Sequence, residues 1–218
     1  MNIYFKTLLL TVFVFILGAI FGIWIDNYRL AEVRTAISQI DVSSNDARLL
    51  NLYFGRLGLL GGENCQLALD QNLIYNNKIY EEGLGIERAI EANKFTPELE
   101  NEKQRYVLLQ VQFWFNSIDL KAKCKFDYSN VVHLYEEKDI SNEQTAENEL
   151  QSSILLELKQ KCGNKIMLIP LETDLNLTVV DTITKQYNIT KYPAIIINEE
   201  TVFQGVTPLA DLENAVGC

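Results

Sequence analysis

The sequence has a single histidine, His133, and only four cysteines and four prolines among its 218 residues. With one histidine and no nucleophile elbow, the chain offers no basis for a Ser-His-Asp site. The cysteines include no C-x-x-C pair and no zinc-ligand spacing, and no glycine-rich phosphate loop is present. From these absences we expect no catalytic residue, no metal and no cofactor. His133 falls within a predicted strand and is interpreted as a hydrogen-bonded core residue.

Basic residues are also scarce, because the chain carries 19 Lys and Arg against 29 Asp and Glu, for a net charge of −10. An acidic surface repels phosphate backbones, so we expect no nucleic-acid partner. The short basic run at Lys121, Lys123 and Lys125 is interpreted as the solvated end of a helix.

Charge is absent altogether from Thr7 to Ile25, the segment TLLLTVFVFILGAIFGIWI. As a helix this segment spans about 28 Å, close to the roughly 30 Å hydrocarbon core of a bilayer. The alternative is a cleaved signal peptide, which would have a shorter apolar region and then a small-x-small cleavage site. The bulky residues IWID stand at that point instead. We therefore predict a short tail at residues 1–6 and a single transmembrane anchor at residues 7–25.

Flanking charge gives a nearly balanced signal for orientation, because Lys6 precedes the anchor while Arg29 and Arg34 follow it. An even number of cysteines and two N-x-T sequons, at Asn176 and Asn188, favour an oxidising exterior. We expect a single-pass protein of the cell membrane whose ectodomain lies outside the cytoplasm.

Residues 27–125 have the apolar spacing of helices and predict a helical bundle with an aromatic core. The first helix is expected to continue out of the membrane. Four further helices are expected, over residues 43–60, 63–82, 86–92 and 96–124. Two of the breaks are placed at Ser43 or Ser44, which favour helix N-caps, and at Gly83, which favours a helix end. An alternative role for the aromatic run Phe113–Phe115 is to line a ligand groove.

From Tyr128 onwards, short apolar runs alternate with helical segments. The runs NVVHLYE and KIMLIPL and the two arms of YPAIIINEETVFQG indicate strands, with a tight turn at Asn198 to Glu200 between those arms. The helices expected here are NELQSSILLELKQKC, a second one capped by Asp174, and PLADLENAV. The element order is therefore β-α-β-α-β-β-α.

This order, with a proline directly before the third strand in YNITKYPAIIINEETVFQG, resembles the thioredoxin family. Within it, the chain is most similar to membrane-anchored members from prokaryotes, which have a helical segment between anchor and domain. The resemblance covers residues 128–218 and implies an α/β fold class for that domain. It also implies a cis peptide bond between Tyr192 and Pro193, ahead of the hairpin.

The family's Cys-x-x-Cys pair lies between the first strand and the first helix and carries out thiol–disulfide exchange. By alignment with the helix that follows, Thr145 and Asn148 stand at those positions here, so redox activity is not expected. The resemblance implies that the groove beside Tyr192 and Pro193, which Thr145 and Asn148 would also line, still binds extended peptides by main-chain pairing.

The four cysteines allow three pairings. The thioredoxin-like topology implies a Cys162–Cys218 bridge, because the first and last helices lie on one sheet face and point the same way. Cys65 begins one helix of the predicted bundle and Cys124 ends its longest, which suits a bridge between antiparallel helices. The alternative is four free, buried thiols in a reducing compartment.

Two functions of different classes follow from these features. The first is a membrane-anchored, redox-inactive interaction module that binds a peptide or protein client and is not an enzyme. The second is a residual thiol–disulfide exchange enzyme that uses one of the remaining cysteines. The second requires a reactive thiol near Tyr192 and Pro193, whereas the first requires none.

Overall fold

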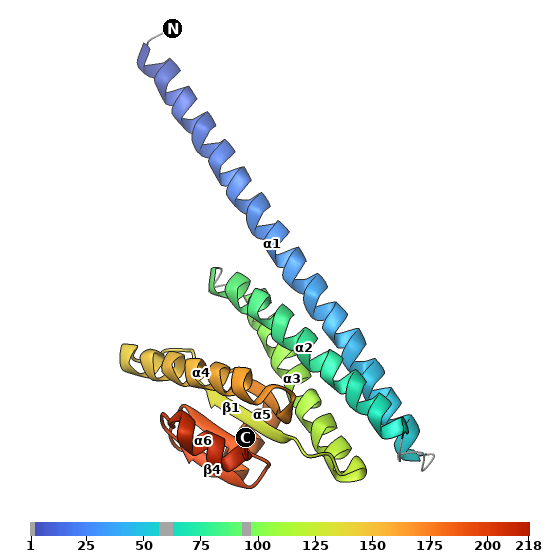
Figure 1. The fold of residues 1–218 in the computed structure, drawn as a ribbon. Helices are drawn as coiled ribbons and strands as arrows, with labels where there is room; N and C mark the ends of the chain where they lie inside the picture. The colour runs from blue at the N-terminus through green and yellow to red at the C-terminus, as the bar shows by residue number, and fades with distance from the viewer. Residues whose placement is uncertain (1–2, 57–62, 93–96) are drawn as a thin grey trace.

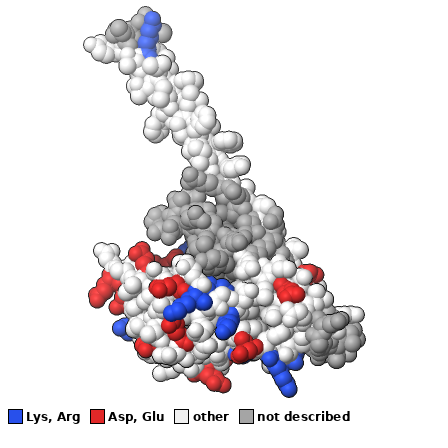
Figure 2. Space-filling model, viewed as in Figure 1, with Lys and Arg blue, Asp and Glu red and all other residues white. Residues whose placement is uncertain are grey.

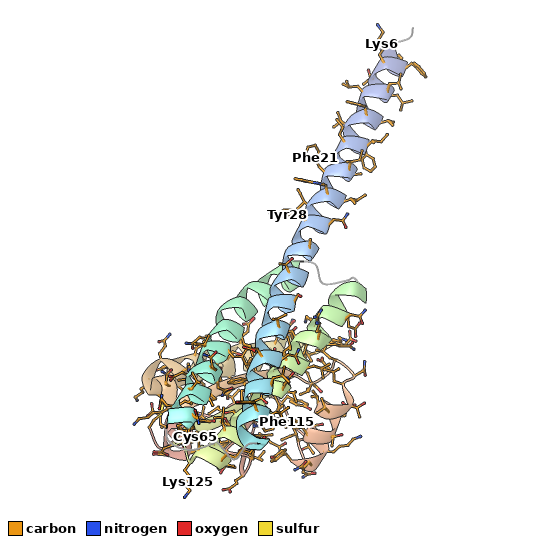
Figure 3. The ribbon with its side chains drawn as sticks, turned by 90° about the vertical axis from the view of Figure 1, so that its right-hand side faces the viewer. Lys6, Phe21, Tyr28, Cys65, Phe115 and Lys125 are labelled. Atoms are coloured by element: carbon orange, nitrogen blue, oxygen red, sulfur yellow. A yellow bond between two sulfur atoms is a disulfide. The ribbon has the colours of Figure 1, made fainter. Side chains whose placement is uncertain are left out.

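The computed structural model describes residues 3–56, 63–92 and 97–218, and three long helices form its N-terminal half (Figure 1). They are α1 (Ile3–Arg56), α2 (Glu63–Ala92) and α3 (Pro97–Cys124). The first part of α1, Tyr4–Ile25, is long and apolar enough to cross a membrane. It projects from the rest of the molecule as a shaft (Figure 2), with Lys6 near its tip (Figure 3). The remainder of α1 packs against α2 and α3.

Two of the predicted helix breaks are wrong. Helix α1 runs unbroken through Ser43 and Ser44 to Arg56, and α2 runs unbroken through Gly83 to Ala92. A glycine inside a helix costs about 1 kcal/mol relative to alanine, and a serine costs less. Packing of these helices against one another outweighs penalties of that size.

The C-terminal part has the predicted order β-α-β-α-β-β-α, with a short 3-10 turn after its first helix. Its elements are β1 (Ser129–Tyr135), α4 (Asn142–Cys162), β2 (Ile166–Glu172), α5 (Thr178–Gln186), β3 (Ala194–Ile197), β4 (Thr201–Gln204) and α6 (Leu209–Val216). The strands form one sheet in the order β2-β1-β3-β4. Strand β1 is parallel to β2 and antiparallel to β3, and β4 is antiparallel to β3. This is a thioredoxin-like α/β fold, as predicted.

Alternation along β1 divides the core between the two faces of the sheet. Val131 packs with Leu155 and Leu158 of α4 and with Leu212 of α6. Its neighbour Val132 belongs to a larger cluster on the opposite face. That cluster is built from β1, β2 and β3 together with α5, α3 and α2. The helical segment and the sheet therefore share one continuous hydrophobic core.

The aromatic run of α3 faces this shared core only in part. Phe113 and Trp114 are each 1% exposed and lie in the cluster with the sheet, whereas Phe115 is 46% exposed. The proposed ligand groove lined by all three is therefore wrong. Successive residues of a helix point about 100° apart, so three in a row cannot line one surface.

Polar contacts fix one end of α3 to the β3–β4 turn. The Trp114 Nε1–H donates to Glu199 Oε1 at 2.6 Å, and the Lys121 ammonium donates to Asn198 Oδ1 at 2.8 Å. Both turn residues have positive φ, 52° for Asn198 and 62° for Glu199, as a tight two-residue hairpin turn requires. Asn130 of β1 completes the network by donating to the same Glu199 oxygen.

A partly buried ion-pair cluster fixes the other end of α3. The Lys103 ammonium lies 2.6 Å from Glu137 and 3.2 Å from Glu172 at the end of β2. Burial, followed by the negative charge of Glu137, raises the pKa of the Glu172 carboxyl to about 7. These effects outweigh the Lys103 ammonium, which by itself would lower that pKa. Burial lowers the pKa of Lys103, but its hydrogen bonds and charge interactions with the two carboxylates outweigh burial, and its pKa is raised.

We expect Trp114→Phe to lower the free energy of unfolding by about 2 kcal/mol, the contribution of a hydrogen bond to a charged acceptor. The change keeps an aromatic ring in the core and removes only the donor to Glu199. Chemical denaturation followed by circular dichroism measures the effect. Trp24→Phe, at a residue 63% exposed on α1, is the matched control and should leave the transition unchanged.

Two disulfides join cysteines that lie at or next to the ends of helices, and both have the predicted partners. Cys65 at the start of α2 is bonded to Cys124 at the end of α3, and Cys162 at the end of α4 is bonded to Cys218. Figure 3 shows Cys65 at the same end of the helical pair as Lys125, the residue after Cys124. Each bridge joins Cα atoms 5.7 Å apart, within the usual range.

Candidate functional site

The loop before β3 and the first turn of α4 form the candidate site. The Tyr192–Pro193 peptide bond is cis. Gln204 of β4 holds the preceding loop, because its Oε1 accepts hydrogen bonds from the backbone N–H groups of Thr190 and Lys191, at 2.8 and 3.0 Å. The Gly205 N–H donates to the Pro193 carbonyl at 2.7 Å. Strand β4 therefore fixes the position of the proline loop.

Ser141 begins the opposite wall. Its φ of −72° and ψ of 158° are extended, and its Oγ accepts from the Gln144 N–H at 3.1 Å, which makes it the N-cap of α4. Capping orients the first turn of α4 so that Gln144 reaches the proline loop. The Gln144 Nε2 donates to the Tyr192 carbonyl at 2.9 Å and to Asn148 Oδ1 at 3.3 Å.

Sequence reasoning missed Gln144, although it lies one helical turn before Asn148 and on the same face of α4. The four predicted groove residues have different surroundings. Asn148 is buried and its Nδ2 donates to the Glu136 carbonyl at 2.7 Å, so it joins α4 to the end of β1. Thr145 is exposed, and its Oγ1 donates to the Ser141 carbonyl. Of the four, Tyr192 and Thr145 present surface that a ligand could contact.

Tyr192 offers one main-chain donor at the site. Its carbonyl already accepts from Gln144. Within the described part of the chain, no group accepts a hydrogen bond from its backbone N–H. An extended ligand could therefore use that N–H, while the carbonyl keeps only its second lone pair.

Negatively charged side chains act on the Tyr192 hydroxyl. Burial raises the pKa of its hydroxyl and a hydrogen bond with Thr173 lowers it, while the negative charges of Glu136, Asp174 and Asp181 raise it. Burial, followed by repulsion from Asp174, also raises the pKa of the Glu136 carboxyl. The rim of the site is therefore acidic.

Asp174 has a different role from the predicted one. The N-cap of α5 is Leu177, and no side chain caps that helix. The Asp174 Oδ2 instead accepts from the backbone N–H groups of Glu137 and Lys138, at 2.9 and 2.5 Å. These two N–H groups follow the end of β1 and have no strand partner. The Asp174 carboxylate accepts their hydrogen bonds and so closes the loop between β1 and α4, which leads into the site.

Neither disulfide lies at this site. Cys162 ends α4, whereas Ser141 and Gln144 are at its start. A helix of 21 residues is about 30 Å long. All four cysteines of the chain are paired, and none is free. No thiol is therefore available beside Tyr192 and Pro193.

His133 lies on β1 and is 3% exposed. Its Nε2 has no hydrogen-bond partner among the described residues, so the interpretation as a hydrogen-bonded core residue is wrong for that atom. Its ring stacks on Tyr135 with centroids 5.2 Å apart. Burial lowers the pKa of His133 to about 4, so the imidazole is neutral at pH 7.

Comparison with known proteins gives matches among solved structures only. No family model and no curated protein matches the sequence. One structure is a thioredoxin-2 from the malaria parasite, a component of its protein secretion machinery, with 16% identity, a TM-score of 0.34, and coverage of 41% of this chain and 82% of that one. Another is chloroplastic thioredoxin z, with 16% identity, a TM-score of 0.34, and coverage of 44% and 82%.

A third match is a malarial protein, with 17% identity, a TM-score of 0.31, and coverage of 41% of this chain and 94% of that one. The fold assignment itself rests on the strand order and directions of the sheet.

Proposed function

We propose that this protein is a membrane-anchored, redox-inactive thioredoxin-like protein that binds an extended segment of a peptide or protein client at the cell surface. The observation that carries the proposal is the pairing of all four cysteines away from the site at Tyr192 and Pro193. Loss of the thiols removes exchange chemistry but leaves the groove wall and the Tyr192 N–H in place. No catalytic residue is part of the proposal.

The anchor and the disulfides support the proposed location. Tyr4–Ile25 could span a bilayer. Disulfides persist in oxidising compartments and are rare in the cytosol, which favours an ectodomain outside the cytoplasm. The same combination of anchor, helical segment and thioredoxin-like domain supports a place among the membrane-anchored thioredoxin-like proteins of prokaryotes.

The charge at the site suggests the chemistry of the client. Three carboxylates, Glu136, Asp174 and Asp181, act on the Tyr192 hydroxyl. The chain as a whole has a net charge of −10. A segment with Lys or Arg beside its main-chain contact would be attracted to this rim, and an acidic segment would be repelled.

Binding of synthetic peptides to the full chain in lipid nanodiscs tests the proposal. Three peptides of one extended sequence would carry Lys, Gln or Glu at the central positions. We expect the Lys peptide to bind at least tenfold more tightly than the Glu peptide at low salt, and the difference to shrink as salt is added. Asp181→Asn should weaken the Lys peptide several-fold. Asp211→Asn, an exposed change on α6, is the matched control.

Equal binding of the Lys and Glu peptides, or no binding of any, would contradict a peptide site with an acidic rim. The thiol-enzyme alternative is tested in the same preparation by insulin reduction. We expect no turnover, because no free thiol exists. Turnover that disappears on alkylation would favour the enzyme instead.

A further inference from the structure

Two loops next to the candidate site are held by a helix from outside the thioredoxin-like fold. They are residues 136–141, between β1 and α4, and residues 173–177, between β2 and α5, here called the site loops. The first ends at Ser141, the N-cap of α4. The second begins with Thr173, whose side chain is hydrogen-bonded to the Tyr192 hydroxyl. The positions of the site loops therefore determine where the groups around Tyr192 lie.

Ion pairs attach the start of α3 to the first site loop. The Lys103 ammonium donates to Glu137 in that loop at 2.6 Å and to Glu172, the last residue of β2, at 3.2 Å. The side chains of Lys103 and Glu172 are 21% and 5% exposed, so salt screens this pair little. One turn earlier on α3, Glu100 accepts from the Lys138 ammonium. Two adjacent residues of the loop are therefore held by the same helix.

A neutral hydrogen bond attaches α3 to the second site loop. The Gln104 Nε2 donates to the Leu175 carbonyl at 2.8 Å. The preceding residue, Asp174, joins the two loops, because its carboxylate accepts from the backbone N–H groups of Glu137 and Lys138. Helix α3 and Asp174 together hold the site loops as one unit.

Further hydrogen bonds connect the first site loop to the main chain of Tyr192. The Glu136 carbonyl, at the start of that loop, accepts from the Asn148 Nδ2 at 2.7 Å. The Asn148 Oδ1 accepts from Gln144, which also donates to the Tyr192 carbonyl. A shift of the loop would therefore disturb the contacts that hold Tyr192, whose N–H is the donor offered to a client.

We propose that Lys103 and Gln104 are positioning residues of the peptide site, which hold the site loops in the arrangement that binds a client. The inference rests on the proposed function and extends it, because it makes α3 part of the binding unit. Neither side chain has to touch the client. Both act through the loops, so the loss of either should weaken an extended peptide whatever its charge.

Charge alone predicts a different result for Lys103→Met. This change removes a positive charge close to an acidic rim, so a peptide with central Lys residues would bind more tightly if only charge mattered. A neutral peptide would then bind as before. If Lys103 positions the loop, both peptides bind more weakly. Gln104→Ala changes no charge and should act in the same direction.

Binding of the neutral Gln peptide to the full chain in lipid nanodiscs tests the inference. We expect Lys103→Met and Gln104→Ala each to raise its Kd by about fivefold, the effect of losing contacts that a hydrogen bond's net contribution sets. Lys103→Arg keeps the positive charge and should restore most of the binding. Trp114→Phe is the matched control, because it removes a hydrogen bond at the other end of α3 and should leave the Kd unchanged.

Hydrogen exchange of residues 136–141 gives a second readout that does not depend on a peptide. Their exchange should quicken by about tenfold in Lys103→Met, because the loop opens more easily, and should not change in Trp114→Phe. Circular dichroism checks that each variant folds. Gln104→Ala keeps the test decisive if Lys103→Met does not fold.

A wild-type Kd for the Gln peptide in both Lys103→Met and Gln104→Ala would overturn the inference while leaving the peptide site standing. Tighter binding of the Lys peptide alone in Lys103→Met would also overturn it, and would assign Lys103 a purely electrostatic effect. If the wild-type chain bound no peptide, the proposed function would fail instead. Hydrogen exchange would then decide separately whether α3 holds the site loops, and unchanged exchange in Lys103→Met would overturn that as well.

Discussion

A fragment that begins at Asp127, and therefore lacks α1, α2 and α3, is expected not to fold. Val132, Leu134, Ile169 and Ile196 are at most 1% exposed and lie in the cluster that α3 completes. Six buried side chains of α3 belong to that cluster: Tyr106, Val107, Leu109, Val111, Phe113 and Trp114. Each such side chain contributes about 1.5–3 kcal/mol when buried. Together they contribute about 9–18 kcal/mol, which is as large as the 5–15 kcal/mol by which a typical domain is stable.

The polar contacts of α3 add to this effect, because the fragment would leave Glu172 and Glu199 without Lys103 and Trp114. A fragment of residues 63–218, which keeps α2, α3 and both disulfides, is the matched control and should fold. Circular dichroism and urea denaturation compare the two. A cooperative transition for residues 127–218 would show that the predicted domain of residues 128–218 is independent of the helices.

The strand and helix pattern after Tyr128 was predictable because alternation and turn chemistry are local. The apolar runs and the tight turn at Asn198 to Glu200 determined the order of elements, and the resemblance based on that order located Pro193. The partner of α3 was not predictable in this way. Helical periodicity identifies Phe113 and Trp114 as buried, but it does not say whether they pack on another helix or on a sheet.

The candidate site was likewise predictable only where local sequence patterns determine it. Tyr192 and Pro193 were located by the hairpin, but counting back along the helix picked out Thr145 and Asn148 and passed over Gln144. A count of residues does not reveal which side chain of a helix's first turn is long enough to reach a neighbouring loop. Asp174 was misassigned as a helix cap for a related reason. Its actual hydrogen-bond donors, the N–H groups of Glu137 and Lys138 after β1, are distant in sequence, so local reasoning could not identify them.

The two buried titratable groups, His133 and Glu172, are expected to leave the stability of residues 26–218 nearly flat between about pH 6.5 and 4.5. Burial lowers the pKa of His133 from 6.5 to about 4, so the unfolded chain takes up a proton before the folded chain does as pH falls. This effect removes about 1.4 kcal/mol of stability per pH unit in that window. Burial raises the pKa of Glu172 from 4.5 to about 7, so the folded chain takes up that proton first, which adds stability as pH falls.

Single variants should reveal the two opposed contributions. In His133→Leu only the Glu172 effect is left, so stability should rise as pH falls from 6.5 to 4.5. In Glu172→Gln only the His133 effect is left, so stability should fall by about 3 kcal/mol between pH 6.5 and 4. Leucine at 133 also removes the unpartnered Nε2, so this variant should fold. Urea denaturation of residues 26–218 at several pH values measures these slopes, with Asp211→Asn as the control. If both variants kept the wild-type pH dependence, the two buried groups would not be the source of it.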